Sequence, residues 1–460
     1  MLFRSVGKIP FGPTYEEMLY PDKAPSEIRQ KAIKARKEDE MDPVNLFNIT
    51  WKDENNQVRK IVLPKELTGV EANIVVMLGT DFPSGAHKVG PAYSMLMEAS
   101  VDGIVEPGKN TILGPSTGNF GIGTAYISNL MGYKAIVPMP DNMSKERYER
   151  IQQYGGELDL TPGTESDVIL TVYRTIELKK DPINYSLDQF ELMSNYRFHR
   201  YVTGNSAIEA VEGVGNGRIA CYAVCVGTAG TFAAGDEMKK AFPECKLVAL
   251  EPYECPTLTK DARGQHRIEG IGDKLCSLIQ NINNTDFVTL IHDDDAVKAL
   301  KIMRDGKDVL VKMGIDPEVA ETYKDLFGVS GMANIIGAIK MAKYLKLGPG
   351  DNVVTIATDG FDRYHSVIEE LERRYLETED FVLERWARDI FMDASEDNVH
   401  DFRTPKAKER LYEQKEQDWV RFGYSKEFLE TLKNQDYWEE EYSKIPEWNE
   451  KIKTIRGKTI

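Results

Sequence analysis

Short apolar runs rich in β-branched residues alternate with amphipathic stretches along most of this chain, beginning near residue 73. The first runs are ANIVVMLG, NTILGP and KAIVPMP, and stretches such as SKERYERIQQYGG separate them. Strands joined by helices of this length are typical of right-handed crossover connections, which place the strands parallel in a sheet that helices cover on both faces. The alternation therefore predicts an α/β fold with parallel sheets.

A second series of strand and helix segments follows, with IACYAVCVG, KLVALEP and NVVTIATDG as its strands. Two series imply two α/β lobes, and ligands of such proteins usually bind in a cleft beside the strand ends. We therefore expect an N-terminal extension packed on the larger lobe, then the smaller lobe, the larger lobe and a helical C-terminal extension. These four parts are expected to cover residues 1–72, 73–205, 206–375 and 376–460.

The expected C-terminal extension is highly charged and carries Trp386, Trp419, Trp438 and Trp448. Segments such as TPKAKERLYEQKEQDWVRF read as amphipathic helices. A regulatory ligand-binding module would normally show strands of its own, and no strand pattern is evident here. We expect these helices to pack on the lobes or on a neighbouring subunit.

The composition limits the partners and the compartment. A formal net charge of −16 repels phosphate backbones and anionic lipids, so we expect neither nucleic acid nor membrane partners. No apolar run approaches the roughly 20 residues of a membrane span. Among the five cysteines, the spacing of Cys221 and Cys225 fits no common zinc pattern. We expect buried thiols, no metal and a cytoplasmic location.

A lysine candidate lies in the segment FPSGAHKVGPAY, where Lys88 precedes a helix with Pro91 in its first turn. An amine at such a junction can be partly desolvated, which lowers its pKa and makes it nucleophilic. Most lysines are solvated surface charges, so this segment alone does not establish a function. Its neighbour His87 is expected to be packed or to face a phosphate rather than to act as the base.

Three glycine-rich loops follow, each at the expected start of a helix or in a turn. They are GPSTGNFGIGTA at 114–125, VGTAGTFAAG at 226–235 and HRIEGIGDKL at 266–275. The second comes directly after an apolar strand, where backbone N–H groups at a helix start can surround a phosphate. It matches neither the Walker pattern nor the dinucleotide fingerprint. The first suits a carboxylate or a phosphate, although an ordinary glycine turn explains it equally well.

In this order the four segments resemble the tryptophan-synthase β-like (fold type II) enzymes that depend on pyridoxal 5′-phosphate (PLP), over about residues 73–366. The resemblance is closest to the cysteine synthase and cystathionine β-synthase branch. It implies that Lys88 carries the cofactor, that Asn119 bonds the cofactor's 3′-oxygen, and that the phosphate lies on Gly227, Thr228, Ala229, Gly230 and Thr231. It further implies a substrate site formed by Ser116, Thr117, Gly118, Phe120, Gln189 and Gly270.

Two departures from that branch bear on the chemistry. Phe120 stands in place of a carboxylate-binding threonine, so the pocket gains an aromatic wall. In that branch, one segment faces the pyridine nitrogen of the cofactor. Its alignment with this chain makes Thr358 or Asp359 the partner of that nitrogen, unless the alignment slips by one residue. A hydroxyl would leave the nitrogen largely unprotonated, whereas an aspartate would protonate it and deepen the electron sink.

The resemblance implies β-elimination or β-replacement on a small amino acid such as serine, cysteine or an O-activated serine, by a homodimer or a higher homo-oligomer. An amino-acid ammonia-lyase or dehydratase, or a lyase for a larger amino acid, is the alternative, and a catalytically silent partner subunit is a third. Asp273, next to the last glycine turn, is a candidate general base for the second substrate. An aspartate that merely ends the turn is the other interpretation.

Overall fold

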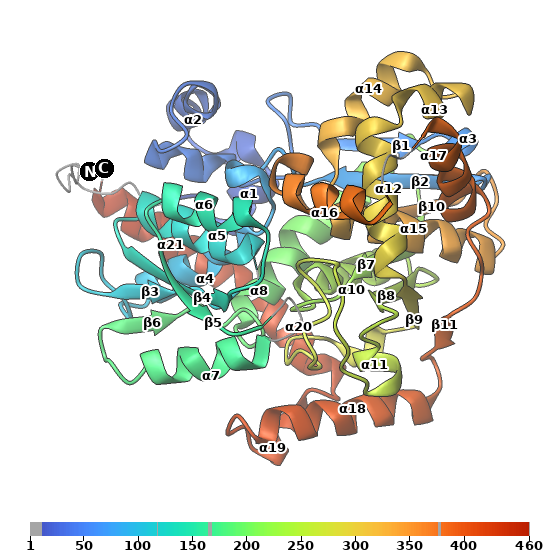
Figure 1. The fold of residues 1–460 in the computed structure, drawn as a ribbon. Coiled ribbons are helices and arrows are strands. Elements are labelled where there is room, and N and C mark those ends of the chain that lie inside the picture. The colour runs from blue at the N-terminus through green and yellow to red at the C-terminus, as the bar shows by residue number, and fades with distance from the viewer. Residues whose placement is uncertain (1–11, 117, 164–167, 376–378, 460) are drawn as a thin grey trace.

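The computed structural model describes residues 12–116, 118–163, 168–375 and 379–459. The described strands form two sheets, each covered by helices, which confirms the predicted α/β fold (Figure 1). All four strands of the smaller sheet run parallel, as do the five central strands of the larger one.

The larger sheet has seven strands in the order β1-β2-β10-β7-β8-β9-β11. Its two edge strands, β1 and β11, pair antiparallel with their neighbours. The strands are β1 (Lys60–Leu63), β2 (Asn73–Leu78), β10 (Asn352–Ala357), β7 (Ile219–Cys225), β8 (Lys246–Pro252), β9 (Phe287–Ile291) and β11 (Val399–Asp401). The helices of this part are α3 (Lys65–Thr68), α9 (Gly204–Ala210), α10 (Gly230–Ala241), α11 (Thr257–Lys260), α12 (Asp293–Asp305), α13 (Lys307–Lys312), α14 (Pro317–Leu326), α15 (Val329–Tyr344) and α16 (His365–Tyr375).

The smaller sheet has the strand order β5-β4-β3-β6. Its strands are β3 (Thr111–Leu113), β4 (Lys134–Pro140), β5 (Glu157–Thr161) and β6 (Asn184–Ser186). The helices beside it are α4 (Val89–Val101), α5 (Asn119–Leu130), α6 (Lys145–Gln153), α7 (Val168–Leu178) and α8 (Met193–Phe198). The predicted boundary at residue 73 is wrong for β2, because this strand lies between β1 and β10 in the larger sheet. Periodicity identifies a strand but not the sheet it joins.

The N-terminal segment, predicted to pack on the larger lobe, is divided between the two lobes, and its first helices lie on the smaller one. Its helices are α1 (Tyr15–Leu19) and α2 (Ser26–Glu38). The Tyr15 hydroxyl donates to Glu98 of α4 at 2.7 Å, and the Tyr126 hydroxyl of α5 donates to the Glu40 carbonyl at 2.8 Å. At the end of this segment, β1 joins the larger sheet, and Leu67 of α3 packs in the apolar cluster of the larger lobe.

The C-terminal extension is helical apart from the short strand β11, and it wraps around both lobes (Figure 1). Its helices are α17 (Asp380–Ala387), α18 (Pro405–Val420), α19 (Lys426–Thr431), α20 (Gln435–Ser443) and α21 (Ile445–Thr459). Helix α20 contacts α8, and α21 contacts α1 and α4. A buried ion pair of 2.6 Å joins Arg456 of α21 to Glu17 of α1.

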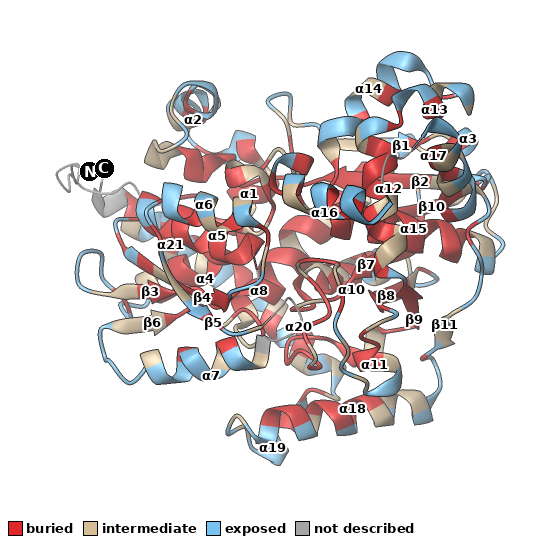
Figure 2. Ribbon diagram, in the orientation of Figure 1, coloured by how far each residue is buried: buried red, intermediate tan, exposed pale blue. Residues whose placement is uncertain are grey.

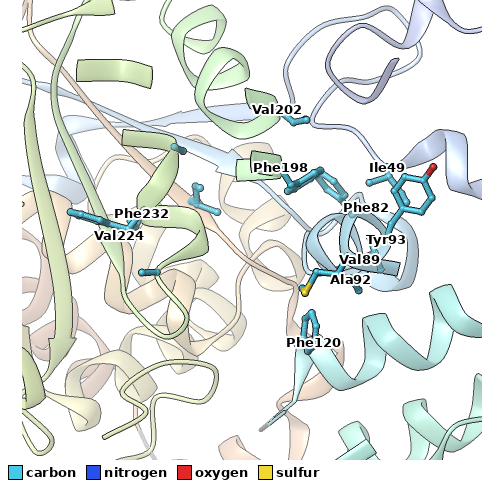
Figure 3. Packing of buried hydrophobic residues seen from close by; sticks show 14 of the residues in the cluster. Ile49, Phe82, Val89, Ala92, Tyr93, Phe120, Phe198, Val202, Val224 and Phe232 are labelled. Atoms are coloured by element: carbon cyan, nitrogen blue, oxygen red, sulfur yellow. The ribbon is translucent and has the colours of Figure 1, made fainter. Parts of the chain in front are cut away.

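Burial follows the sheets and the helix faces turned toward them, while the outer faces of α2, α7 and α18 are exposed (Figure 2). All five cysteines are free and buried. One apolar cluster extends from Ile49 through Val89 and Phe198 to Phe232, and thus joins segments far apart in the sequence (Figure 3). Within the described part of the chain, no helix combines the length and the apolar character needed to cross a membrane.

Candidate active site

A cavity between the two lobes collects most of the residues that the sequence indicated. Among its lining residues are Lys88, Ser116, Gly118, Asn119, Phe120, Gln189, Gly227, Thr228, Thr231, Gly270, Asp273 and Thr358. Ala229, Gly230 and Asp359 are not among them, and Thr117 lies outside the described residues.

Lys88 lies at the N-terminal end of α4, directly after a loop held against the end of β10. Ala86 forms an isolated antiparallel bridge with Asp359, and the His87 amide donates to the Thr358 carbonyl at 3.3 Å. Burial lowers the pKa of Lys88 to about 8, against the opposing effect of Asp273. The uncharged amine, the form that acts as a nucleophile or a base, is therefore far more populated near neutral pH than in a solvated lysine.

Asp273 is 6% exposed and lines the same cavity. Burial raises the pKa of its carboxyl to about 7, and the positive charge of Lys88 partly offsets this effect. A buried carboxyl that titrates near neutrality can take up and release protons at working pH. A solvated turn aspartate would retain an ordinary pKa, so the burial favours the catalytic interpretation of this residue.

We predict that Lys88 reacts with formaldehyde and borohydride in the cofactor-free protein at a rate that rises through about pH 8. Exposed lysines should show this rise near pH 10.5, because only the uncharged amine reacts. Asp273→Asn should move the inflection for Lys88 to lower pH, since the carboxylate stabilises the charged amine. Peptide mass spectrometry across a pH series measures both rates, and an inflection of Lys88 near that of the exposed lysines would contradict the prediction.

The segment 227–231 forms an anion cradle at the start of α10. Ala229 has a left-handed conformation with φ of 63°, and α10 has no side-chain N-cap. The Thr228 hydroxyl oxygen accepts from the Gly230 amide at 3.3 Å. A Cβ atom at Gly230 would lie 2.3 Å from Asn195 Oδ1, so no larger residue fits there. Uncapped N–H groups at a helix start, next to two threonine hydroxyls, are suited to a phosphate.

The loop before α5 supplies short donors to the opposite wall of the cavity. The Ser116 hydroxyl oxygen accepts from the Gly118 amide at 2.8 Å and keeps its own proton for a ligand. Gln189 donates from Nε2 to the Pro115 carbonyl at 3.0 Å, which holds the loop in place. Phe120 is 2% exposed and belongs both to the cavity wall and to the apolar cluster of Figure 3.

Asp359, which is not among the residues that line the cavity, belongs to a buried polar network. Its Oδ2 accepts from Asn119 Nδ2 at 2.6 Å and from the Tyr364 hydroxyl at 2.7 Å. Asn119 Oδ1 in turn accepts from Arg363 at 2.6 Å, which leaves the second amide hydrogen of Asn119 for a ligand. Thr358, which lines the cavity, is thus better placed than Asp359 to contact a bound ring.

Sequence reasoning missed the buried pair Arg147–Glu269, which continues this network across the cleft. The guanidinium of Arg147, on α6, lies 2.9 Å from the Glu269 carboxylate and donates to the Tyr364 hydroxyl at 3.0 Å. A Cβ atom at Gly118 would lie 1.7 Å from Arg147 Nη1, so the pair also abuts the loop before α5. In the sequence, Arg147 is one of several charges on an amphipathic helix, and nothing there distinguishes it from exposed neighbours.

His87 is buried against Trp51 and His199, with ring centroids 5.6 Å and 5.2 Å away. Burial lowers the pKa of His87 to about 3, and the charge of Lys88 adds to this effect. Neither ring nitrogen has a hydrogen-bond partner among the described residues. His87 also lines the cavity, so a neutral imidazole nitrogen remains for a ligand.

The chain matches the family model described as pyridoxal-phosphate dependent enzyme over residues 63–359. It therefore belongs to this family of PLP-dependent enzymes. Among curated proteins, the cysteine synthase of Staphylococcus aureus is 34% identical over 296 residues, covering 64% of this chain and 88% of that protein. A probable cysteine synthase of Bacillus subtilis is 32% identical over 286 residues, covering 62% and 85%.

Solved structures of similar fold belong to related enzymes. O-acetylserine sulfhydrylase isoform 3 of Entamoeba histolytica is 26% identical with a TM-score of 0.59, covering 72% of this chain and 92% of that one. A hydrogen sulfide-producing enzyme of Fusobacterium nucleatum is 26% identical with a TM-score of 0.58, covering 66% and 95%.

The residues around the cavity fit PLP. Lys88, Thr358 and three residues of the 227–231 segment line one cavity, and α10 begins there without a side-chain cap. A Cβ atom at Gly230 would clash with Asn195. These groups match the aldehyde, the phosphate and the ring nitrogen of the cofactor.

Proposed function

We propose that this protein catalyses β-replacement on an O-activated serine, with a thiol or sulfide as the second substrate. The observation that carries the proposal is the single cavity in which Lys88, the 227–231 cradle and Asp273 meet. The similarity of the chain to cysteine synthases and to an O-acetylserine sulfhydrylase supports the same chemistry. When bound, PLP supplies an electron sink for the charge that develops at the substrate's α-carbon.

We assign Lys88 to hold the cofactor, to remove the α-proton of the substrate and to return it at the end. With PLP bound, the Thr358 hydroxyl would pair with the ring nitrogen, Asn119 with the 3′-oxygen and residues 227–231 with the phosphate. The substrate carboxylate is assigned to Ser116, Thr117, Gly118, Gln189 and Gly270. Phe120 forms the wall beside the side chain of the substrate. A hydroxyl at the ring nitrogen favours loss of the β-substituent over chemistry that needs a protonated ring.

Asp273 acts in the second half of the reaction. The β-substituent leaves with the electron pair of the broken C–O bond, and the incoming sulfur forms a new bond to the β-carbon. Asp273 accepts the proton of the thiol, as its pKa of about 7 allows. Without a nucleophile, addition of water and release of ammonia would give the elimination outcome instead.

The test is a single turnover with O-acetylserine and a thiol, followed by mass spectrometry. Wild-type protein should release acetate and form the thioether. Asp273→Asn should retain the acetate release, while thioether formation slows by about 10²–10⁴-fold, as is typical of a lost acid–base group. Ammonia and a keto acid as the main products would instead favour a dehydratase or ammonia-lyase.

The compartment and the assembly state complete the proposal. Five free, buried cysteines fit a reducing cytoplasm. A homodimer or a higher homo-oligomer remains the expected assembly, and light scattering of the purified chain measures it.

A further inference from the structure

A second cavity adjoins the active-site cavity at Phe190. It is termed here the outer chamber, and its walls include Pro115, Ile176, Asp188, Phe190 and Trp419. Nothing in the chemistry proposed above uses it.

A thin wall of backbone separates the outer chamber from the active-site cavity. Pro115 lines the chamber, while the next residue, Ser116, lines the active-site cavity. In the same way, Asp188 lines the chamber and the next residue, Gln189, lines the active-site cavity. Phe190 lines both spaces. Phe190 is the one described residue that the two sets of lining residues share, so the part of the chamber beside Phe190 lies next to the active-site cavity.

The C-terminal extension closes the chamber on its outer side. Trp419, at the end of α18, and Phe422 line it opposite α7 of the smaller lobe. The rings of Tyr173 and Phe422 lie 6.2 Å apart, so α7 and the extension are in contact. The family match ends at residue 359, which places this wall outside the part that the family model covers.

The chamber combines an apolar wall with an excess of carboxylate. Among the described residues that line the chamber, one cation, Lys179, stands against two carboxyl groups, Asp188 and Glu191, and Lys179 forms an ion pair of 2.8 Å with Asp188. Glu191 accepts a hydrogen bond from the Tyr424 hydroxyl at 2.6 Å. Burial raises the pKa of its carboxyl, and this hydrogen bond and the charge of Lys179 partly offset the effect. Such a lining favours a ligand with an apolar body and a cationic end over an anion such as sulfide.

We propose that the outer chamber binds the nucleophilic substrate, a thiol that carries an ammonium group on an apolar body and reaches the active site past Phe190. This inference rests on the proposed function and specifies its second substrate. The thiol end lies toward Phe190 and Asp273, and the ammonium end toward Glu191. The extension thus changes the acceptor from a small anion to a larger, cationic thiol.

The test compares two tryptophan substitutions on α7. Ile176 lines the chamber and is 42% exposed, so Ile176→Trp narrows the chamber without disturbing the core. Leu170 is 47% exposed on the same helix but is not a chamber residue, so Leu170→Trp is the matched control. The acceptors are 4-(aminomethyl)benzenethiol and sulfide, each below saturation, with O-acetylserine as the first substrate.

Ile176→Trp should slow thioether formation with the aminothiol by about ten-fold or more, the scale at which a hydrophobic pocket discriminates size. The rate with sulfide should stay unchanged, and Leu170→Trp should match wild type with both acceptors. Glu191→Gln should weaken use of the aminothiol about 2- to 5-fold relative to uncharged benzenethiol, as expected for a partly exposed charge pair. An equal loss with sulfide, or no loss with the aminothiol, would overturn the proposal.

A binding measurement separates this inference from the proposed reaction. Calorimetric titration of the holoenzyme with 4-methylbenzylamine, which lacks the thiol, should give binding in wild type and Leu170→Trp and none in Ile176→Trp. If this pattern holds although no acceptor yields a thioether, the reaction is wrong and the chamber assignment stands. If thioethers form but the amine binds all three proteins equally, the chamber assignment is wrong.

Discussion

Lys88→Ala should reduce turnover by at least about a thousandfold while the fold stays intact, because the variant loses both the amine that holds the cofactor and the base for the α-proton. Lys88→Arg should fail as well, since a guanidinium stays protonated at working pH. Turnover is measured as acetate release from O-acetylserine, and far-UV circular dichroism checks the fold.

Lys415 provides an internal control for the attachment site. Burial also lowers the pKa of this lysine to about 8, but its amine donates to the carbonyls of Leu278 and Gln280 rather than lining the cavity. Borohydride reduction of the holoenzyme should therefore attach the cofactor to the peptide with Lys88 and leave the peptide with Lys415 unlabelled. A label on Lys415, or full turnover by Lys88→Ala, would refute the assignment.

Glu269→Gln should lower the free energy of unfolding by about 3–5 kcal/mol, because the substitution leaves the guanidinium of Arg147 buried without its carboxylate. The Arg147 side chain is fully buried and the Glu269 side chain is 11% exposed, so solvent cannot replace the lost charge. The pair also joins α6 of the smaller lobe to the loop that precedes Asp273. Urea unfolding monitored by tryptophan fluorescence measures the change.

An exposed pair on the same helix supplies the control. Lys145 and Glu149 lie 3.2 Å apart with side chains 80% and 60% exposed. Glu149→Gln should cost only about 0–1 kcal/mol, the usual value for a surface pair. Equal costs for the two substitutions would show that burial of Arg147 carries no special penalty.

The sequence by itself determined the fold class and most of the cavity. Strand and helix periodicity predicts parallel sheets because burial on both faces demands continuous apolar strands. The glycine-rich loops at 114–125 and 226–235 could be located because close backbone approach to a ligand restricts which residues fit. The resemblance to fold type II enzymes singled out Lys88 and Asp273, and both line the cavity.

Only the tertiary structure decided which lobe each segment joins and which charges meet. The pairing of β2 with β10 and the packing of the N-terminal segment on α4 and α5 depend on contacts between residues far apart in the chain, which periodicity does not record. The same holds for the Arg147–Glu269 pair and for the outer chamber, whose walls come from α7 and from a C-terminal helix about 250 residues later. Side chains that converge from distant segments leave no local pattern, because their chemistry arises from burial and proximity rather than from spacing along the sequence.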